Sequence, residues 1–350
     1  MKYLFHLGHP AHFHLFKNVI LQLQQSNHTV FVLIKKKDIL EDLLINSNIP
    51  YHNILPGGRK NSKLGISIGL LKQTLRLFIF TLKKRPVLLI GSTFPIAVVG
   101  KILGIRSLVF NEDDVDVIQD FAKLCYPLIS NIVAPEVCSA GKWEYKKISY
   151  KGYHELAYLH PNNFTPDKKI AEKYIRVDEP YFLLRFSDFN AYHDEGKRGI
   201  SADMCNSIIK ILKPRGNVYI SSEKVLEKNL EKYRIIINPL DMHHILAFAK
   251  IFIGDSQTMA AEAGVLGIPF IRYNDFVGRL SYLDELENKY TLGYGFKTDL
   301  ESEVYDKINY LLELENIDAE WKTKQKKMLA DKIDPNDFYL SIINGQVKKA

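Results

Sequence analysis

Short apolar segments alternate with segments of helical periodicity along most of this 350-residue chain. In the first half, the pattern predicts helices at residues 12–27 and 38–48 and strands at residues 2–8, 28–35, 51–55, 85–91, 107–112 and 131–136, the last closing the sheet. Parallel strands need crossover connections, and these are usually helices. The alternation therefore predicts a parallel sheet with helices on both faces.

The alternation starts again in the second half, with strands predicted at 180–187, 216–222, 234–239, 251–256 and 269–273 and helices at 201–213, 223–233, 242–249 and 258–267. The segment between the halves is polar and contains Pro161 and Pro166, as expected of a linker. We expect an α/β protein with two doubly wound, Rossmann-like domains. The predicted divisions are a first domain at 1–150, a linker at 151–178, a second domain at 179–300, and a helical tail at 301–350 that packs back on the first domain.

Composition favours a soluble globular protein, because 46% of the residues are hydrophobic and 25% are charged. The start of the chain lacks the apolar region of a signal peptide, and the longest charge-free apolar run, residues 86–100, is too short to span a bilayer. We expect a cytoplasmic protein without transmembrane helices. The three cysteines have no metal or redox spacing and are expected to be buried thiols.

The formal net charge of +7 suits nucleic acid, an anionic membrane surface or a phosphorylated substrate, but equally a basic solvated surface. No zinc-finger or helix-turn-helix pattern accompanies it, so no nucleic-acid partner is expected. Residues 57–86 carry eight cations and no acidic residue, interleaved with Leu, Ile and Phe. This segment predicts either an interfacial helix on an anionic membrane or a core helix whose cations reach solvent.

Ligands of open α/β sheets bind beyond the carboxyl ends of the strands. After the predicted strand 251–256, a helix begins whose amino terminus favours phosphate, and a glutamate one turn further could accept hydrogen bonds from a ribose. A capped helix with a surface glutamate is the alternative. The candidate donor-binding residues here are Gly254, Asp255, Ser256, Gln257, Thr258, Met259 and Glu262. Arg185, Ser187, Ser221 and Ser222 follow two other strands of the same domain and are further candidates.

In the first domain, His6, His9, His12 and His14 surround the first strand-to-helix turn. No set of ligands with zinc spacing is visible, so no metal is expected, and a single histidine could act as general base. After the third strand, Gly57, Gly58, Arg59 and Lys60 suit an anionic ligand or form a flexible basic loop. Glu112 and Asp114 follow the strand 107–112 and either position a hydroxyl, act as base, or cap a helix.

Five segments in order resemble motifs of the family called domain of unknown function 354, regarded as predicted glycosyltransferases. They are HPAHFHLFKNVILQL (9–23), PGGRKNSKLG (56–65), VFNEDD (109–114), YKGYHELAYLHP (150–161) and QTMAAEAGVLGIP (257–269). The resemblance implies the GT-B fold, in which two Rossmann-like domains face each other across a cleft. It also implies that Glu262 binds the ribose of a nucleotide donor, that residues 256–258 hold the diphosphate, and that His12 is the functional histidine.

The expected function is a metal-independent transfer of a sugar from a nucleoside diphosphate sugar, with UDP as the expected nucleotide and no further cofactor. The acceptor would be a glycan or lipid-linked hydroxyl in surface polysaccharide biosynthesis, bound by His9 and residues 57–60, with His12, Glu112 or Asp114 as base. A peripheral location on the inner face of the membrane would fit a lipid-linked acceptor. Two alternatives stay open: a nucleotide-sugar 2-epimerase using His193 with Asp114, and a non-catalytic protein that binds through its basic surface.

Overall fold

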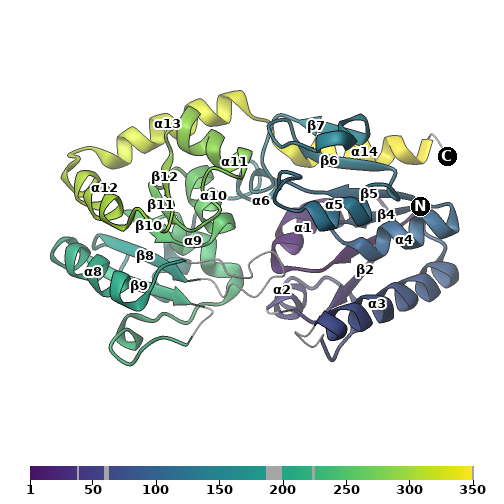
Figure 1. Ribbon diagram of the computed structural model, residues 1–350, viewed down its shortest axis with the longest axis horizontal. Helices are drawn as coiled ribbons and strands as arrows, with labels where there is room; N and C mark the ends of the chain where they lie inside the picture. Colours follow the sequence, from purple (N-terminus) through teal and green to yellow (C-terminus); the bar gives the residue numbers. More distant parts are fainter. Residues whose placement is uncertain (38, 59–62, 187–198, 223–224, 349–350) are drawn as a thin grey trace. The chain divides into compact units, whose positions relative to one another are not determined.

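The computed structural model describes residues 1–37, 39–58, 63–186, 199–222 and 225–348. The chain forms two compact units (Figure 1). The first unit contains Met1–Tyr158 and Ile333–Ala350, and the second contains Leu159–Lys332. The segment predicted as a tail, 301–350, is thus divided between the two units at Lys332.

The first unit is built on a seven-stranded sheet of order β3-β2-β1-β4-β5-β6-β7. All of its described strand pairs are parallel, and the register places Phe5 opposite both Val32 and Ile90. The strands are β1 (Lys2–Leu7), β2 (Thr29–Lys35), β3 (His52–Leu55), β4 (Leu88–Gly91), β5 (Arg106–Phe110), β6 (Asn131–Pro135) and β7 (Lys147–Tyr150). β7 was not predicted: it extends the sheet beyond residues 131–136, which were wrongly expected to close it.

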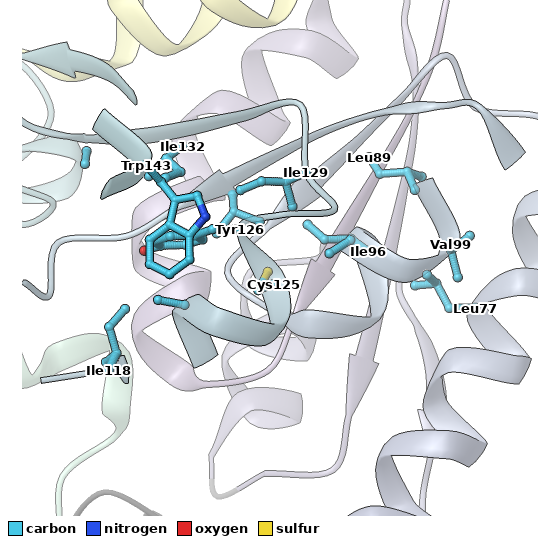
Figure 2. Packing of buried hydrophobic residues seen from close by; sticks show 14 of the residues in the cluster. Leu77, Leu89, Ile96, Val99, Ile118, Cys125, Tyr126, Ile129, Ile132 and Trp143 are labelled. Carbon is cyan, nitrogen blue, oxygen red and sulfur yellow. The ribbon is translucent and has the colours of Figure 1, made fainter. Parts of the chain in front are cut away.

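Helices connect these strands, because parallel neighbours cannot be joined by a tight turn. The connecting helices are α1 (Pro10–Gln25), α2 (Leu40–Asn46), α3 (Lys63–Lys84), α4 (Phe94–Leu103), α5 (Gln119–Cys125) and η1 (Gly141–Lys146). Two further helices follow the last strand: α6 (Leu156–Leu159) and, from the chain's end, α14 (Pro335–Lys348). One core cluster fills the space beside the sheet with residues of β1, β4, α3, α4 and α5 (Figure 2). Tyr126 and Trp143 meet there edge to face, with ring centroids 5.5 Å apart.

The second unit has a five-stranded sheet of order β12-β11-β10-β8-β9, and its described pairs are parallel too. Its strands are β8 (Tyr181–Phe186), β9 (Asn217–Ser222), β10 (Ile251–Gly254), β11 (Phe270–Tyr273) and β12 (Gly293–Phe296). Its helices are α7 (Lys168–Ala171), α8 (Ala202–Leu212), η3 (Lys213–Arg215), η4 (Glu231–Tyr233), η5 (Pro239–Asp241), α9 (Met242–Leu246), α10 (Gln257–Leu266), α11 (Ser281–Asp284), η6 (Glu285–Lys289), α12 (Glu301–Glu313) and α13 (Ile317–Asp331).

Two predictions for the second unit are wrong. The described part of residues 223–233 contains a turn and the short 3-10 helix η4 but no α-helix, and residues 234–239 form no strand. The chain there runs beside β9 through a single bridge between Ile220 and Arg234. Ile236 is 86% exposed, so the apolar run Ile235–Ile237 does not face a sheet core. Apolar composition without burial explains the error.

The cysteines Cys125, Cys138 and Cys205 are buried and unbridged, as predicted. Burial raises the pKa of the Cys125 and Cys205 thiols to about 12, so neither is a reactive thiolate near neutral pH.

A buried ion pair joins β11 to η6 in the second unit. Arg272 is completely buried, and its Nε donates to Glu287 Oε1 at 3.0 Å. Removing one partner of such a pair leaves an uncompensated buried charge, which costs about 3–5 kcal/mol. We expect Arg272→Met to lower the free energy of unfolding of the second unit by this amount, measured by denaturant titration followed by Trp321 fluorescence in a Trp143→Phe background.

The double variant Arg272→Met/Glu287→Leu is the control, because replacing both charges with apolar groups should recover most of the loss. A change of less than about 1 kcal/mol in the single variant would show that the pair does not stabilise this unit.

Candidate functional site

The order of the second sheet reverses direction between β8 and β10, and ligands of open α/β sheets bind at such a switch point. Gly254 ends β10 here. A Cβ on Gly254 would lie 2.8 Å from the backbone oxygen of Arg185, so glycine permits the close pairing of these two strand ends. The chain turns directly from this position into α10.

Ser256 is the N-cap of α10, and its Oγ accepts a hydrogen bond from Met259 N at 3.3 Å. Ala260 N donates to Ser256 O at 3.2 Å and so begins the helical ladder. The amides of Gln257 and Thr258, one turn earlier, have no acceptor within the helix. The first turn carries no acidic side chain. This end of the helix therefore presents N–H groups and a positive partial charge to a ligand.

Glu262 lies one turn further along α10 and is only 4% exposed. Its Oε1 lies 3.0 Å from Nε2 of His243, on α9. Glu262 is thus not the surface glutamate of the alternative reading. A buried carboxylate held by an imidazole at a strand-to-helix turn has a fixed orientation. His243 was not among the sequence candidates, because the pair joins residues 19 positions apart on two helices.

Arg185 and Ser221 stand opposite each other at the ends of β8 and β9, and Arg185 Nη1 donates to Ser221 Oγ at 2.8 Å. Asp255 directly follows β10 and is buried. Its backbone oxygen accepts a hydrogen bond from Asn274 Nδ2 at 2.9 Å. The structure thus brings most of the predicted donor-binding residues to the carboxyl edge of one sheet: Arg185, Ser221, Ser222 and Gly254 through Met259. Ser187 and His193 lie outside the described residues.

In the first unit, the sheet reverses between β1 and β4, and a cavity of about 230 Å³ lies at this switch point. Its lining combines polar and apolar residues. The more polar ones are Gly8, His12, Lys35, Gln73, Ser92 and Thr93, and the apolar ones are Ile66, Leu70, Phe94, Pro95 and Phe121. Lys35, Ser92 and Thr93 were missed by the sequence analysis. They end β2 or follow β4, so the carboxyl-end rule alone could have found them.

His12 is held in one tautomer by the backbone. Gly8 N donates to His12 Nδ1 at 3.1 Å, so the neutral ring carries its proton on Nε2. Burial lowers the pKa of His12 well below its usual value, and the nearby His9 and Lys35 lower it further. At neutral pH, His12 therefore offers a hydrogen-bond donor. His9 is the N-cap of α1, with Nδ1 accepting from Ala11 N at 3.2 Å.

The acidic candidates of the first unit bind its own backbone. Asp114 Oδ1 accepts from Ser139 N at 2.7 Å, and Glu112 Oε2 accepts from His154 N at 3.2 Å. Neither is among the described residues that line the cavity. Their role as base therefore stays a prediction. Gly57 and Gly58 follow β3, whereas Arg59 and Lys60 lie outside the described residues.

Among the described residues, no three His, Cys, Asp or Glu side chains gather closely enough to hold a metal ion. The expectation of a metal-independent site stays a prediction.

The chain belongs to the family described as Protein of unknown function (DUF354), whose profile matches residues 2–318. No curated protein matches it by sequence. Its fold is the GT-B fold of nucleotide-sugar enzymes, as the resemblance implied.

Three solved structures illustrate this likeness. UDP-GlcNAc 2-epimerase from Neisseria meningitidis, bound to UDP-GlcNAc, is 18% identical with a TM-score of 0.67, covering 100% of both chains. The spinosyn rhamnosyltransferase SpnG complexed with thymidine diphosphate is 13% identical with a TM-score of 0.65, covering 99% of both. MurG from Acinetobacter baumannii is 13% identical with a TM-score of 0.62, covering 99% of this chain and 100% of that one.

Three histidines with lowered pKa values, His6, His12 and His154, make the first unit sensitive to acid. Burial lowers the pKa of His6 and of His154 from 6.5 to about 3. The unfolded chain therefore takes up protons that the folded unit does not, so stability is complete above pH 6.5 and falls as the pH drops toward 3. Within this window, each of these two histidines should lower the free energy of unfolding by about 1.4 kcal/mol per pH unit.

We expect the free energy of unfolding of the first unit to fall by roughly 2 kcal/mol for each of His6 and His154 between pH 7 and pH 5. Trp143 fluorescence in a Trp321→Phe background follows this unit. His154→Asn should flatten the pH dependence, whereas His52→Asn, at an exposed position, should not. Equal slopes in the two variants would contradict the assignment.

Proposed function

We propose that the protein transfers a sugar from a nucleoside diphosphate sugar, with UDP as the expected nucleotide, to a hydroxyl acceptor. The proposal rests on the position of Glu262. This residue is buried and contacts His243, and it lies one turn beyond the amino terminus of α10, at the switch point of the second sheet. A nucleoside diphosphate offers one anionic group and one diol at about this spacing, and the site offers amides followed by a carboxylate.

In the proposed donor complex, the amides of Gln257 and Thr258 bind the diphosphate and Glu262 accepts hydrogen bonds from the ribose hydroxyls. Arg185, at the end of the neighbouring β8, adds a positive charge at the same edge. These groups stabilise the negative charge that develops on the leaving diphosphate, which is where a transferase lowers its barrier most.

The cavity of the first unit is the proposed acceptor site. His12 and Lys35 in its lining can bind a hydroxyl or phosphate, and its apolar lining residues can contact a hydrocarbon portion of the same molecule. In the tautomer described, His12 orients an acceptor oxygen by donating from Nε2. A base role for His12 would require the other tautomer and the loss of the Gly8 contact. The mixed polar and apolar lining supports a glycan or lipid-linked acceptor, used in polysaccharide biosynthesis at the cytoplasmic face of a membrane.

A nucleotide-sugar 2-epimerase is the second candidate, supported by the full-length likeness to the Neisseria meningitidis enzyme. It would bind the same donor but need no acceptor. Incubation with a UDP-sugar alone separates the two: isomerised sugar nucleotide would favour the epimerase, whereas release of UDP only when an acceptor is added supports the transferase. If the protein binds no nucleoside diphosphate, the result would favour the third alternative, a non-catalytic protein that binds through its basic surface.

Glu262→Gln tests the donor site most narrowly, because glutamine keeps the size of the side chain and can still contact His243. Loss of a charged hydrogen-bond acceptor costs about 1.5–3 kcal/mol, so we expect UDP to bind roughly 10- to 100-fold more weakly in calorimetry. Glu303→Gln, exposed on α12 of the same unit, is the matched control. Wild-type UDP affinity in Glu262→Gln, with a normal melting temperature, would remove Glu262 from the donor site.

A further inference from the structure

Helix α3 of the first unit turns large aliphatic side chains toward the solvent. Their exposed fractions run from 44% at Ile79 to 71% at Leu71. The members of this α3 stripe are Ile68, Leu71, Leu75, Ile79 and Leu82. Successive residues of an α-helix lie about 100° apart, so intervals of three and four place all five on one face.

The opposite face of α3 packs against the first unit and is itself largely apolar, because Phe78 and Phe80 pack against the core cluster and Ile66 and Leu70 line the cavity. Gln73 is 5% exposed and Thr81 is 1% exposed, and both lie on the face that packs against the first unit. Among the α3 residues whose side chains are described, Leu77 is the one large aliphatic residue that is fully buried. The α3 stripe is therefore a second apolar face, exposed on a helix whose other face already packs against the first unit, and such an exposed apolar patch marks an interaction surface.

Positive charge accompanies the α3 stripe. Lys72, Arg76 and Lys83 are exposed, and the helical spacing places them along one edge of the stripe. The segment 57–86 contains no Asp or Glu. Helix α4 packs beside α3 and ends with exposed Lys101 and Ile102. An apolar stripe edged by cations matches the interface of a bilayer that contains anionic lipids.

The contacts of α3 indicate that it lies along a membrane and does not cross it. Gly65–Lys84 is 20 residues long with a mean hydropathy of 1.3, which by length and composition would suffice to span a bilayer. However, Leu77 packs into the core cluster of the first unit (Figure 2), and Arg76 Nη1 donates to Ile54 O at 2.8 Å. Crossing the bilayer would break both contacts.

We propose that the α3 stripe docks the first unit on an anionic bilayer surface, with the helix lying in the interface plane. This docking goes beyond the proposed function and holds whether or not sugar is transferred. Ile66 and Leu70, on the inner side of the same helix, line the cavity described above. A docked α3 would therefore hold that cavity close to the lipid headgroups.

Vesicle co-sedimentation of the full chain tests the proposal. At low salt, the protein should pellet with vesicles of phosphatidylcholine and phosphatidylglycerol and stay in the supernatant with phosphatidylcholine alone. High salt should reduce binding, because exposed cations are screened. The stripe variant Leu71→Gln/Leu75→Gln/Ile79→Gln should abolish binding. The charge variant Lys72→Gln/Lys83→Gln should lower the partition coefficient on the order of 10-fold.

Matched controls come from the second unit. Val225→Gln/Ile236→Gln removes aliphatic side chains that are 94% and 86% exposed, and Lys326→Gln/Lys327→Gln removes exposed cations of α13. Both controls should bind vesicles like the wild type. Normal melting temperatures and UDP affinity in the stripe variant would show that a loss of vesicle binding is not a loss of folding or of the donor site.

Three results would overturn the proposal. Wild-type protein that stays in the supernatant with anionic vesicles at low salt has no such docking surface. Binding that survives both high salt and a carbonate wash shows a spanning helix instead. A wild-type protein that sediments as a dimer, and becomes a monomer in the stripe variant, shows that a second copy covers the stripe.

Discussion

Parallel strand pairing is the constraint on which the rest of this structure depends. Every described strand pair in both sheets is parallel, so the connection after each strand must return to the end of the sheet where the strands begin. The carboxyl ends then gather at one edge of each sheet, and the loops that leave them hold the chemistry. For this reason, His12 and Thr93 line the same cavity although they are 81 positions apart in the chain. For the same reason, Arg185 and Ser221 form a hydrogen bond.

The two switch points use the same local device. At each switch point, one of the two paired strands ends in glycine: β4, which pairs with β1, ends at Gly91, and β10, which pairs with β8, ends at Gly254. A Cβ on Gly91 would lie 2.5 Å from His6 O, and one on Gly254 would lie 2.8 Å from Arg185 O. Both positions follow an isoleucine and precede a polar turn that begins a helix, α4 or α10. The close approach of the strands brings each helix start against the neighbouring strand end.

Local patterns were enough to predict most strands of both sheets and the α10 turn, because alternation, N-capping and apolar spacing act over a few residues. They failed where tertiary contact decides. Residues 234–239 are apolar yet remain outside the sheet, and β12, with two glycines in four residues, has little strand propensity but pairs with β11. The partner of Glu262 could not be predicted either, since no local pattern relates His243 to it. The tautomer of His12 depends on one backbone amide.

We propose that the turn from β10 into α10 binds a nucleoside diphosphate. Hydrogen–deuterium exchange of the full chain with and without saturating UDP tests it most directly. We expect slower exchange of the α10 first-turn amides, Gln257 to Met259, and of α9 around His243, with little change in the α13 helix of the same unit. Unchanged exchange at α10 under conditions where calorimetry shows UDP bound, with protection elsewhere, would contradict it.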